Sequence, residues 1–375
     1  MKAALGQEGH NRPNSLRGFP FERREAGRSP GGASSATGRS LASRALLRWA
    51  ENNGLFFALV ALVIAFAVAS SRFVTGSNIT VILLQVSVIG VIAVPGAMLV
   101  LAGYVDLSVG SVSALAAIVF GQVATQIHLG EGAALAVALL AGIGWGLMNG
   151  LLIAYAGFSA IVVTLGGLAG AQGLAEVLSG GITQSNFSNW FLYIGNGSPG
   201  GVPLPIWILL GAVGIGAYVW YAMPFGRYFT AIGADRSTAL SLGINVRREI
   251  LWLYVVSGLA AAIGGIVLTS QLDAASLTIG QGEELQVLTA ILLGGVSFVG
   301  GRGTLFGVVI GVLFIGVLDD GLVLVNVNPF INDVAVGAAL VFAAGLDVVY
   351  RRLERVRRSM ELPPGDAGTA VTDDK

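Results

Sequence analysis

The amino-acid sequence predicts an all-α polytopic membrane protein with about ten transmembrane helices. Hydrophobic residues make up 54% of the chain and charged residues only 11%, whereas soluble domains carry roughly 25% charge. Long stretches such as 79–102 and 109–127 contain no Asp, Glu, Lys or Arg. About 20 apolar residues suffice for a helix to cross the hydrocarbon core. Composition and charge spacing together therefore indicate a multi-pass protein.

Ten segments are candidate spans. They are 54–71, 79–102, 108–128, 133–155, 159–179, 204–222, 250–270, 286–301, 304–325 and 332–350. Glycine and polar residues interrupt 108–128, 159–179 and 286–301, so eight or nine crossings with a re-entrant segment is the alternative. The predicted transmembrane domain covers residues 49–350 and contains one large polar loop, 223–249.

Arginine placement predicts the orientation, because basic residues gather in cytoplasmic loops. Three clusters stand out: eight arginines within 1–48; Arg227, Arg236, Arg247 and Arg248 in the loop 223–249; and Arg351, Arg352, Arg355, Arg357 and Arg358 after the last span. Ten crossings with both termini in the cytoplasm place all three clusters inside, together with Arg302. Arg72 and the loop 180–203, which has no Lys or Arg, then lie outside.

The two ends of the chain are polar. Residues 1–48 are rich in Arg, Gly, Ser and Pro, and such segments bury too little apolar surface to order themselves. We expect a disordered cytoplasmic N-terminus over 1–48 and a cytoplasmic tail over 351–375. The first apolar run begins near Leu55, behind the basic tract, which favours an uncleaved first helix. The sequence has no cysteine and zero formal net charge, so neither disulfides nor nucleic-acid binding is expected.

The segment 103–111 places a carboxylate between two apolar runs. Its polar and small residues are Gly103, Asp106, Ser108, Gly110 and Ser111, with Leu107 among them. A charge at that depth costs about 2.5–3.5 kcal/mol on insertion scales. We expect Asp106 to cap a helix beginning near Leu107, with Ser108 assisting. The segment serves either as a buried cap with small-residue packing or as the polar wall of a solute path.

A second interruption lies at 294–304. It contains five glycines, Gly294, Gly295, Gly300, Gly301 and Gly303. Interrupted segments at matching positions of two halves are typical of inverted repeats around a central pathway, so a two-fold repeat is a possible arrangement. A phosphate-binding loop is a poor alternative, because the Gly-Lys-Ser/Thr ending and a following soluble helix are missing.

The loop 223–249 predicts a short surface helix. Asp235 can cap the helix Arg236–Leu242, and Gly243 lies where a glycine commonly ends one. The segment of interest comprises Gly233, Ala234, Asp235, Ala239, Leu242, Gly243 and Ile244. From spacing alone, a solvated connector and a helix that docks into a partner protein are equally good interpretations.

The remaining carboxylates suggest little chemistry. Asp273, Glu283 and Glu284 are expected in an outer loop, and the Asp319–Asp320 pair within or near the end of a span. Most such residues are interfacial, although Asp106 and the Asp319–Asp320 pair are the candidates for ion coupling. The sequence shows no nucleophile–base pair and no metal-ligand cluster, so no catalytic or metal-binding residue is predicted.

Several of these segments together resemble one family. Phe73–Asn78, Asp106–Ser111, Phe158–Gly181, Ala231–Ile244 and Gly294–Gly307 are similar, in this order, to motifs of a transport subunit. That subunit is the membrane permease of bacterial ABC importers for monosaccharides, the ribose, xylose and galactoside type of binding-protein-dependent transport. The resemblance covers about residues 55–350. Tyr104-Val105 and Asp319-Asp320 depart from the family's usual Gly-Ile and Asn.

The resemblance implies the ABC importer permease fold and import of a pentose or hexose by alternating access. Two permease chains would form a homodimer in the bacterial inner membrane. Cytoplasmic ATP-binding subunits would dock on 233–244, and an extracytoplasmic sugar-binding protein would deliver the substrate. The chain itself would be no enzyme and would hold no cofactor, because ATP is bound by the partner subunits. A permease for a nucleoside or a branched-chain amino acid, or an ion-coupled secondary transporter, are the alternatives.

Overall fold

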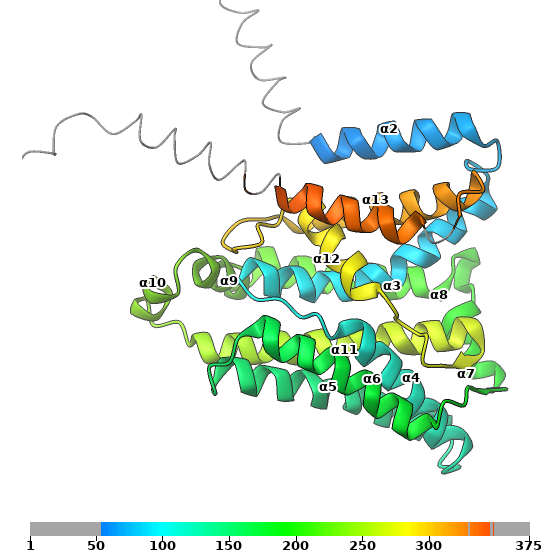
Figure 1. Cartoon of the computed structure of the whole chain (residues 1–375), viewed down its shortest axis with the longest axis horizontal. Helices are drawn as coiled ribbons and strands as arrows, with labels where there is room; N and C mark the ends of the chain where they lie inside the picture. Colours follow the sequence, from blue (N-terminus) through cyan, green and yellow to red (C-terminus); the bar gives the residue numbers. More distant parts are fainter. Residues whose placement is uncertain (1–53, 329–330, 346–347, 349–375) are drawn as a thin grey trace, which may run out of the picture. The chain divides into compact units, whose positions relative to one another are not determined.

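The computed structural model describes residues 54–328, 331–345 and 348. These residues are mostly helical (Figure 1), which confirms the predicted all-α class. A single two-residue ladder, β1 with β2, pairs Gln184 with Ala275 and Ser185 with Ala274. The predicted tails, 1–48 and 351–375, lie outside the described residues.

The elements follow one another without long structureless loops. In chain order they are α2 (Gly54–Ala69), α3 (Gly76–Leu101), α4 (Val109–Thr125), α5 (Glu131–Ala154), α6 (Ala160–Ser179), β1 (Gln184–Ser185), α7 (Asn189–Asn196), η1 (Pro199–Gly201), α8 (Leu204–Ala217), η2 (Tyr218–Ala222), α9 (Pro224–Ala234), α10 (Arg236–Ser241), α11 (Val246–Leu272), β2 (Ala274–Ala275), α12 (Glu283–Leu293) and α13 (Leu305–Leu324). A further apolar helix spans Ile331–Gly345.

Six helices are long and apolar enough to cross a membrane, which makes this a multi-pass membrane protein. They are α3, α5, α6, α8 continued through η2, α11 and α13, and each coincides with a predicted span. Three shorter apolar helices, α2, α4 and Ile331–Gly345, coincide with three others. The total of about ten crossings stays a prediction.

The predicted span 286–301 is not one continuous helix. The helix there, α12, ends at Leu293 after only 11 residues, which is about 16 Å of rise, roughly half of the hydrocarbon core. Gly295, Gly300 and Gly301 follow with φ of 81°, 93° and 77°, a region that glycine adopts without strain. The expected outer loop around Glu283 and Glu284 is also wrong, because these residues form the first turn of α12.

Helix α11 is the central element of the packing and contacts α3, α4, α5 and α7. Its contact with α5 depends on glycines. A Cβ atom added to Gly146 would overlap the carbonyl oxygen of Tyr254. A Cβ atom added to Gly142 would likewise overlap the carbonyl oxygen of Gly258, and one added to Gly258 would overlap that of Gly142. Lipid tails are as apolar as leucine, so close backbone approach through small residues is a main source of helix association in membranes.

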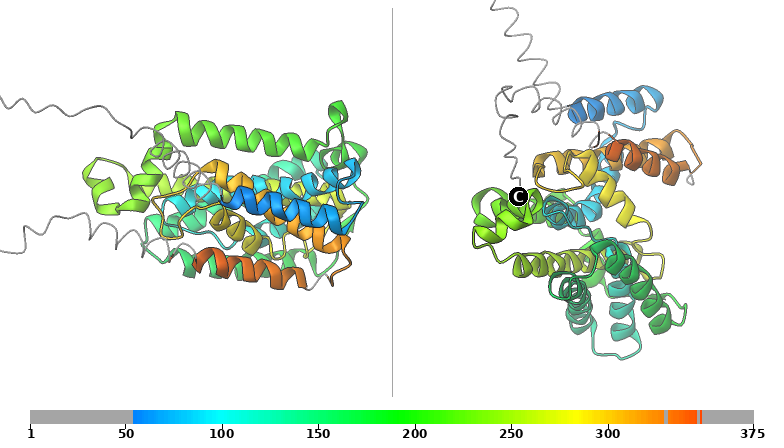
Figure 2. Two further views of the ribbon diagram at one scale, coloured as in Figure 1. Left: turned by 90° about the horizontal axis from the view of Figure 1, so that it is seen from above. Right: turned by 60° about the vertical axis from the view of Figure 1, so that its left-hand side comes forward.

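A second group of helices packs around α3. Helices α8, α12 and α13 all contact it, and α2 lies against α13. The loop with α9 and α10 extends beyond the long helices at one end of these elements (Figure 2). Arg302 follows Gly301, whose N–H donates to the Leu101 carbonyl oxygen at the end of α3. Arg302 therefore lies at the same end as Arg227, Arg236, Arg247 and Arg248, as the charge distribution predicts.

Alanine substitutions on α5 test the glycine contact. Gly146→Ala should lower the unfolding free energy by about 1–3 kcal/mol, because the contact is already filled. Gly144→Ala is the matched control: Gly144 is exposed and a Cβ atom there meets nothing within 4 Å. Thermal melting in detergent should show a lower midpoint for Gly146→Ala only. Equal midpoints for the two variants would contradict the packing.

Candidate functional site

Three segments that stand out in the sequence meet at one place, which we name the glycine junction: Gly103, Gly233, Gly300 and Gly301. The N–H of Gly301 donates to the carbonyl oxygen of Leu101 at 2.8 Å. A Cβ atom on Gly300 would lie 2.9 Å from the Cα atoms of both Gly103 and Gly233. The end of α3, the end of α9 and the loop after α12 are thus in direct backbone contact.

Each glycine of the junction is required by its surroundings. A Cβ atom on Gly233 would overlap the Leu101 carbonyl oxygen, and one on Gly301 would lie 2.9 Å from Cα of Ala234. Gly103 and Gly300 have φ of 83° and 93°, which disfavours any L side chain. No side chain therefore separates the three segments.

The loop helix α10 forms as predicted. The Asp235 carboxylate accepts hydrogen bonds from the Ser237 N–H and hydroxyl, both at 2.8 Å, and from the Thr238 hydroxyl at 2.7 Å. These bonds lower the pKa of Asp235 to about 2. Gly243, at φ 80°, ends the helix, and the Ile244 N–H donates to the carbonyl oxygen of Ala239.

The segment around α10 also carries apolar residues. Ala239 is buried, Ile244 is half-buried, and Leu240 and Leu242 are 55% and 70% exposed. Leu240 in α10 and Leu242, its C-cap residue, therefore present apolar side chains at the surface of this loop.

Asp106 occupies a different position from the predicted one. Helix α4 begins at Val109, with Ser108 as its N-cap residue, so the prediction that Asp106 caps a helix beginning near Leu107 is wrong. Oδ1 of Asp106 instead accepts from the N–H and the hydroxyl of Ser108, at 3.0 and 2.7 Å, forming a turn before the helix. Leu107 lies half-buried within that turn.

The Asp106 turn is joined to α5 and α11 by hydrogen bonds. Ser257 donates to Oδ2 of Asp106 at 2.8 Å, and Asn149 donates to the Ser108 hydroxyl at 3.0 Å. The buried hydroxyl of Tyr254 donates to the carbonyl oxygen of Val105 at 2.8 Å. Two backbone groups in the break after α3, the Val105 carbonyl and the Ser108 N–H, are therefore satisfied by side chains. The geometry supports the structural interpretation of Asp106.

The other predicted site residues serve helix packing. Gly110 and Ser111 are buried in α4, and a Cβ atom on Gly110 would overlap Glu284 and the Gly280 backbone. Gly294 packs against Gly307 of α13, and Gly303, at φ 156°, lies against Val296. A Cβ atom on Gly295 would meet nothing within 4 Å. Thr304 caps α13 through the Gly307 N–H at 3.1 Å.

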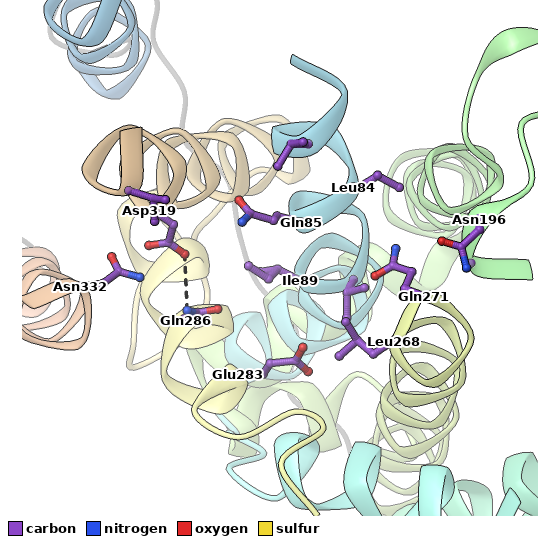
Figure 3. A pocket seen from close by; sticks show the side chains of 14 residues that line it. Leu84, Gln85, Ile89, Asn196, Leu268, Gln271, Glu283, Gln286, Asp319 and Asn332 are labelled. Atoms are coloured by element: carbon purple, nitrogen blue, oxygen red, sulfur yellow. Dashed lines mark hydrogen bonds between the residues drawn. The ribbon is translucent and has the colours of Figure 1, made fainter. Parts of the chain in front are cut away.

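A polar cavity of about 470 Å³ lies toward the opposite end of these helices (Figure 3). This position follows from the direction of the chain. Helices α11 and α13 begin near the glycine junction, and their cavity-lining residues lie in their C-terminal halves, away from the junction. The polar residues that line it come from α3, α11, α12, α13 and the helix Ile331–Gly345: Gln85, Gln271, Glu283, Gln286, Asp319 and Asn332. Asn196 at the end of α7 completes the lining, and its side chain bonds the Ser270 carbonyl oxygen.

The sequence interpretation missed this cavity. Gln85, Gln271 and Gln286 are isolated glutamines beside or within apolar runs, and that was the only sequence signal for them. The adjacent residues Asp319 and Asp320 also lie in two different environments. Asp319 faces the cavity and accepts a long hydrogen bond, 3.4 Å, from Gln286, whereas the buried Asp320 accepts one of 2.7 Å from Asn78 and joins α13 to α3. Among the described residues, no group of His, Cys, Asp or Glu is arranged to hold a metal.

Substitutions at Asp106 separate hydrogen bonding from charge. Asp106→Asn keeps an acceptor for Ser108 and a polar group for Ser257, so we expect a small loss of stability. Asp106→Leu leaves the buried Ser108 N–H without its acceptor, which costs about 1–3 kcal/mol. Thermal melting of the two purified variants measures the difference. Equal losses would show that the negative charge itself is needed.

Similarity to known proteins covers nearly all of the described chain. Residues 78–344 match the family described as branched-chain amino acid transport system / permease component. The ribose import permease protein RbsC of Bacillus subtilis is 36% identical over 78% of this chain and 92% of its own length. The D-allose transport system permease protein AlsC of Escherichia coli is 33% identical over 79% of this chain and 91% of its own length. The L-arabinose ABC transporter permease protein AraH of Azospirillum brasilense is 33% identical over 83% of this chain and 91% of its own length.

No solved structure matches the chain. The family match spans the glycine junction, the Asp106 turn, α10 and the polar cavity, so these features lie within the region shared with the relatives. The chain therefore belongs to the family of permease components described as branched-chain amino acid transport systems.

Proposed function

We propose that this chain is the membrane permease subunit of an ABC importer for a monosaccharide. The observation that carries the proposal is similarity over more than nine-tenths of the length of permeases for ribose, allose and arabinose. The family description names branched-chain amino acids, but the structure favours a neutral substrate. The polar cavity has two carboxylates and no Lys, Arg or His in its lining, so the carboxylate of an amino acid would find no cation there.

The proposed topology places about ten crossings in the bacterial cytoplasmic membrane with both termini in the cytoplasm. Its support is the common location of Arg302 and the arginines of loop 223–249, because basic residues prefer the cytoplasmic side. The polar cavity then opens toward the outside, where an extracytoplasmic sugar-binding protein would deliver the substrate. A two-fold inverted repeat relating the 103–111 and 294–304 interruptions belongs to the same proposal.

The assembly contains two permease chains, proposed as a homodimer, and two cytoplasmic ATP-binding subunits. The ATP-binding subunits dock on the 233–244 segment, where Leu240 and Leu242 offer exposed apolar side chains. ATP is held by those subunits, so the permease chain acts without a cofactor and without enzyme activity of its own. Closure of the ATP-binding dimer moves α10, and the glycine junction passes this movement to the ends of α3 and α12. The result is alternating access to a central path.

Reconstitution tests the function. Proteoliposomes that contain the permease, its ATP-binding subunits and its binding protein should take up one of ribose, D-allose or L-arabinose when ATP is supplied. Replacing the Walker lysine of the ATP-binding subunit should abolish uptake, because binding and hydrolysis of ATP drive the cycle. Uptake that continues in that variant would refute the ABC importer assignment and favour an ion-coupled carrier.

An apolar-to-charged substitution tests the docking surface. Leu242→Asp should weaken binding of the ATP-binding subunits at least about tenfold, since a charge in a desolvated contact is expensive. Leu129→Asp is the control, because Leu129 is similarly exposed, at 61%, but lies in the connection between α4 and α5. Copurification of the ATP-binding subunits measures the effect. Equal recovery with both variants would place the docking surface elsewhere.

A further inference from the structure

The polar cavity contains a concentration of hydrogen-bonding groups that the protein leaves unused. Within the described residues, seven buried side-chain nitrogen or oxygen atoms have no hydrogen-bond partner, and four of them line this cavity. These four are Gln271 Nε2, Glu283 Oε2, Asp319 Oδ1 and Asn332 Oδ1. An unsatisfied buried polar group costs about 1–3 kcal/mol, so four at one place indicate a site that something else completes.

The unused groups are mainly acceptors. Three of the four atoms are oxygens, two of them from carboxylates, and one is an amide donor. Figure 3 shows Asp319, Asn332 and Gln286 on one side of the cavity, Gln271 and Leu268 across from them, and Glu283 between. A ligand that fits this set brings several hydroxyl donors, at least one acceptor and no negative charge.

The remaining lining supplies an apolar surface. Leu84, Val88, Ile89 and Leu268 face the same space, and its volume of about 470 Å³ falls in the usual range for small-molecule sites, roughly 300–1,000 Å³. A sugar ring has hydroxyls around its edge and C–H groups on its faces. Polar acceptors and aliphatic side chains in one cavity match both surfaces.

We propose that the polar cavity is a binding site for a neutral monosaccharide, in which Glu283 and Asp319 accept hydrogen bonds from sugar hydroxyl groups. The inference rests on the proposed function and assigns residues to it. Gln286, which donates to Asp319 at 3.4 Å, positions that carboxylate and leaves its second oxygen for the sugar. Sugar acids and phosphorylated sugars are excluded, because their negative charge would face both carboxylates without a cation in the lining.

The absence of cysteine from the sequence allows a direct binding measurement. Val323 lines the cavity and is 58% exposed, so Val323→Cys in the purified full chain should react with a maleimide. We expect ribose, D-allose or L-arabinose to slow this reaction several-fold. Leu129→Cys, outside the cavity, should react at the same rate with and without sugar.

The carboxylates are then replaced in the Val323→Cys background. Asp319→Asn and Glu283→Gln, which preserve size and an acceptor oxygen, should each raise the sugar concentration for half-protection about tenfold, as expected for loss of a charge-assisted hydrogen bond. The control Glu176→Gln, at an exposed position of α6, should leave the sugar concentration for half-protection unchanged. Melting temperatures confirm that all three variants fold.

Three results would overturn the proposal: no protection by any of the three sugars, protection unaffected by both carboxylate substitutions, or protection by sodium chloride alone, which would identify an ion site. The uptake assay distinguishes this failure from that of the proposed function. Wild-type sugar uptake without protection refutes only the cavity site, whereas absence of uptake of all three sugars counts against monosaccharide import itself.

Discussion

The structure depends on satisfying backbone groups where helices break. Each buried N–H and C=O group freed by such a break needs a hydrogen-bond partner. The break after α3 is closed by the Gly301 N–H on the Leu101 carbonyl oxygen, by the Tyr254 hydroxyl on Val105 and by Asp106 on the Ser108 N–H. The partners come from three separate regions of the chain, so this requirement fixes α3, α4, α11 and the loop after α12 relative to one another.

The same requirement explains why glycine is concentrated at these positions. Backbone hydrogen bonds across the junction need Cα atoms close together, and Gly103, Gly233 and Gly300 allow an approach that a methyl group would prevent. A contact without side chains has little capacity to deform. In the proposed transport cycle, the junction therefore transmits movement of α10 toward the polar cavity, which is formed by the far halves of the same helices. The glycine junction and the polar cavity lie toward opposite ends of α3, α11 and α13.

Composition, charge-free runs and capping residues predicted the elements whose causes are local. The long apolar spans follow from runs without charge, and the helix at Arg236–Ser241 follows from the Asp235 cap and Gly243. The failures involve distant contacts. The chain leaves the helix before residue 301 where Gly300 packs against Gly103 and Gly233, far away in sequence, and Asp106 is bonded to Ser257 of α11.

The polar cavity was beyond prediction for the same reason. Gln85, Gln271 and Gln286 come from three helices, and no sequence spacing shows that their side chains share one space. The adjacent residues Asp319 and Asp320 could not be separated from sequence either, because the partner of Asp320 is Asn78, about 240 residues away. What remains visible in the sequence is a set of single polar residues in apolar helices.

The proposed transmission of movement from α10 through the glycine junction can be tested most directly by replacing Gly233 with alanine. The measurement is the amount of sugar imported per ATP hydrolysed. The added Cβ atom would overlap the Leu101 carbonyl oxygen and lie 2.5 Å from the Gly301 nitrogen, so the segments must separate. Gly214→Ala, where a Cβ atom meets nothing within 4 Å, is the control. Transmission through the junction predicts that Gly233→Ala still binds the ATP-binding subunits but imports several-fold less sugar per ATP. An unchanged ratio would contradict it.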